Sequence, residues 1–230
     1  NGKTLDVSIP SWRKDIDGEA DLVEEITRIH GYEKIPLVSL GSSNSVTRPM
    51  LSPHLLRRSR IRRVLAARGL NECITWSFIS KKHAEIFGGG GRELTLLNPI
   101  SSDLNVMRPS ILPNLVEAAS RNEARGFNDQ SLFEVGPQYS SPEVSGQEWV
   151  ATCIRFGRIG SRDWRKEYRE CDVYDAKADA LAGLDGIGIQ VEKLRSNIDA
   201  PPWYHPGRSG TFSYGSKIVL ANFGELHPRI

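Results

Sequence analysis

The chain has 230 residues, 39% of them hydrophobic, which is enough to bury one large core or a medium domain beside a small one. Thirty Lys and Arg against 28 Asp and Glu leave a formal charge of +2, which argues against a chain devoted to gripping a nucleic-acid backbone. Its three cysteines fit neither a disulfide framework nor a zinc ribbon and indicate reduced thiols: Cys73, Cys153 and Cys171. No apolar run approaches the ~20 residues that span a bilayer, so we expect a cytoplasmic protein with no membrane contact.

The first forty residues predict a small α/β piece. Apolar and polar residues alternate over residues 5–9, which indicates a short strand. Asp21, followed three residues later by Glu24, predicts a capping box at the start of a helix, and Gly31 predicts its end. Residues 33–52 are rich in Pro, Gly and Ser and have little periodicity, so we place a domain linker there.

The next segment begins with a helix and continues with strands. Ser52 is a good N-cap before proline, which predicts a helix over residues 53–68. Alternating apolar residues predict strands near 74–78 and 94–97. The glycines at 88–91 are neither preceded directly by a strand nor followed by the Lys-Ser or Lys-Thr of a phosphate loop, so they indicate a plain connection.

The remaining chain adds more strands than helices. A helix should begin at Leu112 and end near Gly126, and a shorter one, capped by Asp172 or Asp175, should run through Leu181. Strands are expected at 131–139, 147–156, 189–194, 211–213 and 218–220. Because strand and helix do not alternate regularly, we predict an α+β fold in which helices pack on an antiparallel sheet.

Four acidic residues lie close together near the N-terminus. Asp21, Glu24 and Glu25 share one face of the expected helix, and Asp15 precedes it. One reading is structural, because a capping box and the helix dipole both favour acids at this end. The other is a magnesium site, because hard divalent cations prefer oxygen ligands. The spacing by itself leaves both open.

Several short blocks, in this order, resemble one protein family. They are PSWRKDI at 10–16, EADLVEEI at 19–26, HGY at 30–32, NPISSD at 98–103, VMR at 106–108, LFEVG at 132–136, YDAK at 174–177, HPGRS at 205–209 and GELHP at 224–228. Each block is weak alone, but together they span nearly the whole chain. The sequence is therefore similar to the β subunit of bacterial phenylalanyl-tRNA synthetases.

The resemblance implies an architecture and a set of partners. Residues 1–40 would be the C-terminal part of a small helix-turn-helix-like domain, and residues 41–230 a non-catalytic class II synthetase-like domain. The enzyme would be a dimer of αβ pairs that charges tRNA(Phe) with phenylalanine, and ATP would bind in the catalytic α subunit. The resemblance also implies that Mg²⁺ is bound by carboxylates of β, with a contribution from α, at Asp15, Asp21, Glu24 and Glu25.

The two arginines that hold ATP phosphates in class II enzymes are not evident in this sequence. The acidic residue of the 132–136 block has no arginine immediately before it, and the glycines at 183, 186 and 188 are not followed by a suitable arginine. Residues 157–162 only imitate such a motif, in a segment that we expect to be a loop. We therefore assign no catalytic residue and no cofactor-binding residue to this chain.

Two other functions remain as alternatives. A free-standing ATP-dependent ligase would need substitutes for the missing arginines, such as Arg108 or Arg208. A nucleic-acid-binding module is suggested by the truncated helix-turn-helix-like start and by the arginines at 57–63, although such a charge run is more often a solvated helix face.

The other polar candidates have structural interpretations. His205 and His227 lie next to prolines and glycine in two of the blocks, which suits turns built around a hydrogen-bonded imidazole. Lys177, beside Asp175, is interpreted as one half of a surface ion pair rather than the remains of a substrate pocket.

Overall fold

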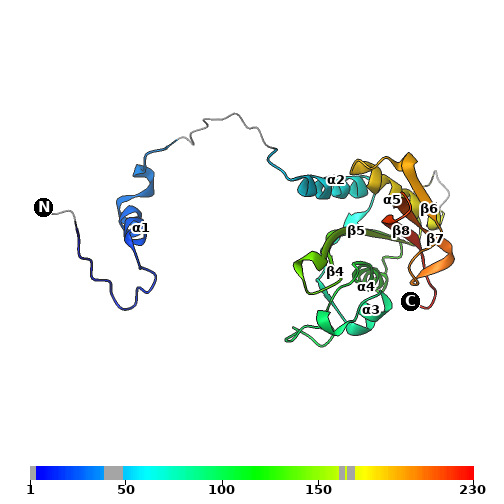
Figure 1. Ribbon diagram of the computed structural model, residues 1–230, viewed down its shortest axis with the longest axis horizontal. Coiled ribbons are helices and arrows are strands. Elements are labelled where there is room, and N and C mark those ends of the chain that lie inside the picture. Colours follow the sequence, from blue (N-terminus) through cyan, green and yellow to red (C-terminus); the bar gives the residue numbers. More distant parts are fainter. Residues whose placement is uncertain (1–3, 39–48, 161–163, 165–168) are drawn as a thin grey trace. The chain divides into compact units, whose positions relative to one another are not determined.

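The structure is a computed structural model that describes residues 4–38, 49–160, 164 and 169–230. It divides into two compact units, Asn1–Pro49 and Met50–Ile230 (Figure 1). The boundary expected at residues 40 and 41 falls outside the described residues and stays a prediction. Within the described residues, none of the helices has both the length and the apolar character needed to cross a bilayer.

The first unit contains one α-helix, α1 (Glu19–His30), and a short 3₁₀ turn, η1 (Tyr32–Lys34). The helix ends as predicted at Gly31, whose φ of 108° favours glycine. The capping prediction was wrong in detail: Gly18 is the N-cap, and Asp21 lies in the first turn, where its carboxylate accepts the Gly18 N–H at 2.9 Å. The strand expected at 5–9 is absent from this unit's described residues, because Leu5 is 89% exposed and no second strand pairs with the segment.

The second unit opens with α2 (Pro53–Ala67), which confirms the predicted helix, and the Ser52 hydroxyl accepts the N–H of Leu55. Short elements follow: β1 (Asn71–Glu72), β2 (Phe78–Ile79), α3 (Lys81–Ile86), η2 (Arg92–Leu94) and β3 (Val106–Met107). The predicted strand at 74–78 forms only at its end, because the Thr75 N–H bonds to the Glu134 carboxylate instead of a neighbouring strand. The strand expected at 94–97 is reduced to a single bridge between Thr95 and Val106. Gly88–Gly91 is a connection, as predicted.

The centre of this unit consists of α4 (Leu112–Glu123) and the long antiparallel pair β4 (Gln130–Tyr139) and β5 (Gln147–Phe156), joined by η3 (Val144–Gly146). All three major elements confirm their predictions. β1 adds to β4 in parallel, giving the order β1-β4-β5, while β2 and β3 form a separate antiparallel pair.

Helices cover both faces of β4 and β5, with α2 and α5 on one side and α4 on the other (Figure 1). The alternation along β4 explains this arrangement. Phe133 and Val135 pack against Leu65 of α2, whereas Leu132 packs against Leu115 of α4. Residues facing both ways are buried, so β4 is the central strand of the core.

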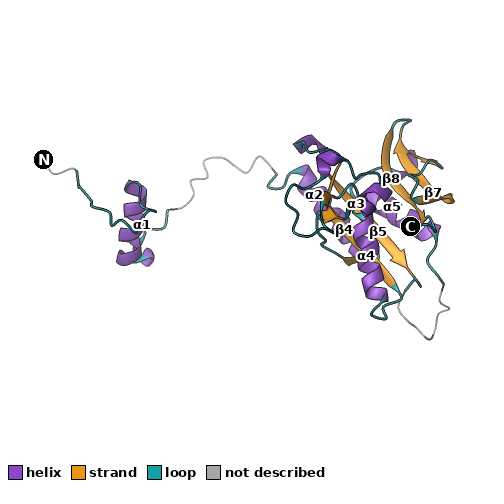
Figure 2. Ribbon diagram, turned by 90° about the horizontal axis from the view of Figure 1, so that it is seen from below, coloured by secondary structure: helices purple, strands orange, loops and turns teal. Residues whose placement is uncertain are grey.

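The last part contains α5 (Val173–Gly186), η4 (Val191–Lys193) and a second antiparallel sheet, β6 (Leu194–Asn197), β7 (Tyr204–Tyr214) and β8 (Ile218–Leu226). Asp172 is the N-cap of α5. The helix contacts β5 and β8 and so joins the two sheets (Figure 2). It also lies close to α2: a Cβ on Gly186 would meet Val64 Cγ2 at 2.5 Å, so this glycine serves helix packing.

Candidate functional site

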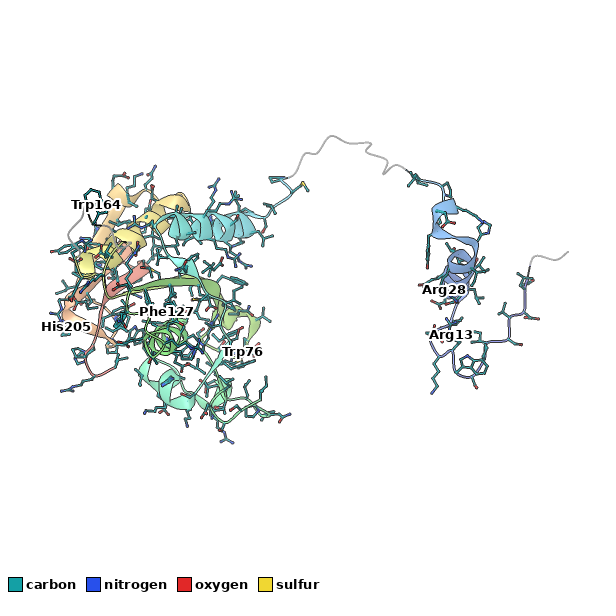
Figure 3. All side chains as sticks on the ribbon, turned by 180° about the vertical axis from the view of Figure 1, so that it is seen from behind. Arg13, Arg28, Trp76, Phe127, Trp164 and His205 are labelled. Atoms are coloured by element: carbon teal, nitrogen blue, oxygen red, sulfur yellow. The ribbon has the colours of Figure 1, made fainter. Side chains whose placement is uncertain are left out.

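The N-terminal carboxylates are held by arginines rather than gathered around an open centre. Arg13 donates to Asp15 at 2.8 Å and to Glu25 at 2.6 Å, and Arg28 donates to the other oxygen of Glu25 at 2.6 Å (Figure 3). Asp21 accepts the backbone N–H groups of Asp17 and Gly18, both at 2.9 Å. Glu24 is exposed on α1.

These contacts determine the charge state of the carboxylates and bear on their ability to bind a metal ion. Arg13 holds the pKa of Asp15 below its usual range and, with Arg28, lowers the pKa of Glu25 to about 2. The donor set therefore has the charge and oxygen chemistry that Mg²⁺ prefers. In this chain alone, Arg13 occupies two of the carboxylates and no group of three metal-ligating side chains converges among the described residues, so the four carboxylates need further ligands to form a metal site.

The second polar centre is an ion pair inside the second unit, Met50–Ile230. Arg108 and Glu134 are 1% and 4% exposed, and Arg108 Nη2 donates to Glu134 Oε1 at 2.8 Å. Arg108 also donates to the Pro137 carbonyl oxygen at 2.9 Å and to the Thr75 hydroxyl at 2.9 Å. A Cβ on Gly136 would meet Arg108 Nη2 at 2.7 Å, so the glycine of this block makes room for the guanidinium. The block at 132–136 thus encloses Arg108, whose role is structural.

Arg208 and two arginines of α2 have protein partners as well. Arg208 pairs with Glu225 at 2.6 Å on the surface. On α2, Arg62 pairs with Glu72 at 2.8 Å and Arg58 lies 3.4 Å from the ring centroid of Trp149. Arg57, Arg60 and Arg63 are exposed. Arg162, in the motif look-alike, lies outside the described residues.

A third centre, missed by the sequence reasoning, joins three elements. Asp179 on α5 is 1% exposed and accepts from Arg155 of β5 at 2.6 Å and from Arg68, next to the end of α2, at 2.5 Å. Arg155 also donates to Ser131 at 3.0 Å. The available signal was a lone acid among Ala176, Ala180 and Gly183 on the inner face of α5, because a charge on an apolar face is rarely buried without a partner. This network fixes α5 to β5.

A groove of about 1140 Å³ runs between β5 and β8, with α5 along its base. Every residue of β5 lines it, together with residues 220–226 of β8. Burial raises the pKa of the Cys153 thiol to about 12 and that of the Tyr204 hydroxyl to about 12, so both groups are neutral at pH 7. All three cysteines are free, as predicted. The groove is broad and largely apolar.

The histidines have the structural roles predicted for them. His205 Nδ1 accepts the N–H of Gly207 at 3.1 Å, and His227 Nδ1 accepts that of Arg229 at 3.2 Å, so each ring closes a turn. The two rings stack with centroids 6.5 Å apart.

The predicted ion pair between Lys177 and Asp175 was wrong. Asp175 binds Arg169 through both oxygens, which lowers the pKa of the Asp175 carboxyl. Lys177 instead lies over Phe223, 5.8 Å from the ring centroid. An exposed arginine can reach a carboxylate with two parallel hydrogen bonds, which a lysine cannot match.

Comparison with known proteins agrees with this geometry. Residues 1–32 match the tRNA synthetase B5 domain model, and residues 42–230 match the phenylalanyl tRNA synthetase beta chain CLM domain model. Curated phenylalanine–tRNA ligase beta subunits are similar throughout: 48% identity over 98% of this chain in Rhodospirillum rubrum, 50% over 96% in Paramagnetospirillum magneticum and 50% over 99% in Bartonella henselae. The chain spans 28%, 28% and 29% of these three relatives.

Two solved structures of pyrrolysyl-tRNA synthetase from Desulfitobacterium hafniense are also similar. One has a TM-score of 0.54 at 17% identity, covering 97% of this chain and 73% of the other; the second has 0.53 at 14%, covering 88% and 63%. At such identities the likeness concerns the fold alone, and it confirms the class II synthetase-like α+β architecture. Together with the family matches, it shows that the chain belongs to the phenylalanyl-tRNA synthetase β-chain family.

Proposed function

We propose that this chain is a non-catalytic scaffold within phenylalanine–tRNA ligase. In the assembled enzyme, two αβ pairs attach phenylalanine to tRNA(Phe) in the cytoplasm, and ATP binds in the α subunit. The chain contributes a class II-like surface that contacts the α subunit and supports the tRNA. This proposal is supported by the family membership and by the protein partners that the arginines of the class II-like unit already have.

One observation carries the non-catalytic assignment: Arg108 is enclosed in the core. A phosphate-binding arginine must present its donors to an open site. Arg108 instead directs its donors at Glu134, Pro137 and Thr75, all within the protein. Arg208, the other substitute considered for an ATP site, pairs with Glu225. Neither is placed to clamp a nucleotide.

Calorimetric titration of ATP and of a non-hydrolysable phenylalanyl-adenylate analogue tests this assignment. We expect heat of binding from the αβ assembly and none from the β subunit alone. Arg208→Ala in β should leave binding by the assembly unchanged, because this arginine is not part of the nucleotide site. Nucleotide binding by β alone, abolished by Arg208→Ala, would establish the free-standing ligase instead.

Exposed apolar side chains support a protein partner for the class II-like unit. Ile74 is 93% exposed, and Trp76, Leu97 and Ile100 are exposed as well. Large apolar side chains in water cost free energy that a partner surface recovers. The proposed partner is the α subunit.

We also propose that Mg²⁺ binds at Asp15, Asp21, Glu24 and Glu25 once the α subunit contributes its ligands. In the arrangement of this chain, Arg13 occupies Asp15 and Glu25, so the ion and this guanidinium compete for the same oxygens. A cation between the subunits would help to fix their contact and take no part in the chemistry.

The competition makes the metal proposal testable by titrating Mg²⁺ into the αβ assembly in a calorimeter. Arg13→Ala should tighten Mg²⁺ binding, because it frees two carboxylates. Asp21→Asn should weaken it, while keeping an oxygen that accepts the N–H groups of Asp17 and Gly18 and so preserving the helix start. If Asp21→Asn binds as well as wild type, the carboxylates are only helix-terminal acids.

A further inference from the structure

Two histidines, one at the start of β7 and one just after β8, each use only one ring nitrogen inside the protein. His205 Nδ1 accepts the Gly207 N–H at 3.1 Å, and His227 Nδ1 accepts the Arg229 N–H at 3.2 Å. A ring nitrogen that accepts a hydrogen bond carries no proton, so each neutral imidazole has its proton on Nε2. Neither Nε2 has a hydrogen-bond partner within the described residues, and neither is buried. Both rings therefore offer an N–H donor to the solvent.

The backbone holds these two donors in place. β7 bulges at residues 205–208, which lie opposite a single residue of β8. The Ser209 hydroxyl donates to the His205 carbonyl oxygen at 2.7 Å, and the His227 N–H donates to the Trp203 carbonyl oxygen at 2.9 Å. The two rings are nearly parallel, with centroids 6.5 Å apart, and His205 lies at the outer edge of the second unit (Figure 3). The donors are thus fixed side by side at the surface.

The charge around the two rings favours an anion. Residues 200–210 and 226–230 contain no Asp or Glu. The nearest acid along β8, Glu225, already pairs with Arg208 at 2.6 Å. Arg229 is exposed and makes no ion pair within the described part of the chain. An anion would therefore meet two N–H donors and an unpaired guanidinium, whereas a cation would meet no free carboxylate from these segments.

We propose that His205 and His227 together bind one backbone phosphate of tRNA(Phe) through their Nε2–H groups, and that Arg229 supplies positive charge beside it. Nearly parallel rings at this separation can donate to two oxygens of the same phosphate. Contacts of this kind position a nucleic acid and read no sequence. The inference rests on the proposed function, in which this chain supports the tRNA, and it names the place where that support is given.

Asparagine and glutamine separate the two nitrogens of each histidine. The amide oxygen of asparagine replaces Nδ1, so His205→Asn and His227→Asn keep the acceptor of each turn and lose the outer donor. The amide nitrogen of glutamine replaces Nε2, so His205→Gln and His227→Gln keep the outer donor and lose the acceptor. A purely structural role predicts that glutamine is the damaging replacement, whereas a phosphate contact predicts that asparagine is.

Binding of fluorescently labelled tRNA(Phe) to the αβ assembly with full-length β tests the contact. The double asparagine variant should bind on the order of thirtyfold more weakly, about fivefold for each lost hydrogen bond, with an unchanged midpoint in urea unfolding. The double glutamine variant should keep its affinity within about threefold and unfold at a lower urea concentration. Wild-type affinity in the asparagine variant, in an assembly that still charges tRNA(Phe), would overturn the inference and leave the proposed function intact. A wild-type assembly that binds no tRNA(Phe) would instead refute the proposed function.

Salt dependence gives a second readout of the same contact. Arg229→Gln should make the slope of log affinity against log salt concentration shallower by about one, because it removes one cation from the phosphate. The asparagine variant should bind more weakly at every salt concentration with an unchanged slope, because the histidines contribute neutral donors.

Two controls identify the ligand. Calorimetric titration of inorganic phosphate into the assembly should give no binding heat at millimolar concentrations. Saturable phosphate binding that the asparagine variant loses would assign the site to a free phosphate ion and refute the assignment to tRNA. An asparagine variant that instead weakens the association of α with β would assign it to a protein partner, with the same consequence.

Discussion

Replacing Arg108 by alanine is expected to lower the free energy of unfolding of the class II-like unit by about 3–5 kcal/mol, because it leaves the Glu134 carboxylate buried without a partner charge. Both side chains are almost fully enclosed. The substitution also removes the donors to the Pro137 carbonyl and the Thr75 hydroxyl, so a buried acceptor is left unsatisfied. Urea unfolding followed by circular dichroism measures the loss.

Two control variants separate burial from mere charge removal. Arg208→Ala breaks an arginine–glutamate pair of similar length on the surface and should cost less than about 1 kcal/mol. Combining Arg108→Met with Glu134→Gln removes both charges and should be less damaging than Arg108→Ala alone. If Arg108→Ala were no worse than Arg208→Ala, the ion pair would not hold the core together.

The elements predicted well from sequence are those whose signals are local. Ser52 and the proline after it mark the start of α2, and alternation over ten residues marks β4 and β5 to within one residue. Prediction failed where a side chain far away in the sequence forms a hydrogen bond with the backbone. The Glu134 carboxylate binds the N–H of Thr75, 59 residues earlier, and no pattern in 74–78 reveals this.

The same distinction applies to the candidate sites. Helical spacing correctly placed Asp21, Glu24 and Glu25 on one helix, but it could not show that Arg13, twelve residues before Glu25, reaches over to bind it. The sequence pattern named Arg108 as a possible substitute for a phosphate-binding arginine, but it could not show that this side chain points at Glu134. The orientation of the Arg108 side chain depends on tertiary contacts. Within the 132–136 block, Gly136 is the residue that leaves space for its guanidinium.

The second large effect is expected at Asp179. Asp179→Ala should cost about 3 kcal/mol or more, because two arginines lose their shared carboxylate and their positive charges are left close together. Arg155 Nη2 also donates to the Arg68 carbonyl oxygen at 3.1 Å, which holds the Arg155 guanidinium in place beside Arg68. The loss should appear as a lower midpoint in urea unfolding.

Asp175→Asn on the same helix is the matched comparison. Its partner, Arg169, is exposed, so the change should cost no more than about 1 kcal/mol. The amide oxygen of asparagine keeps an acceptor for the Asp172 N–H at the start of α5. A cost for Asp179→Ala equal to that of Asp175→Asn would mean that α5 is held to β5 by apolar packing alone. A much larger cost would show that the buried carboxylate anchors the base of the groove to its β5 wall.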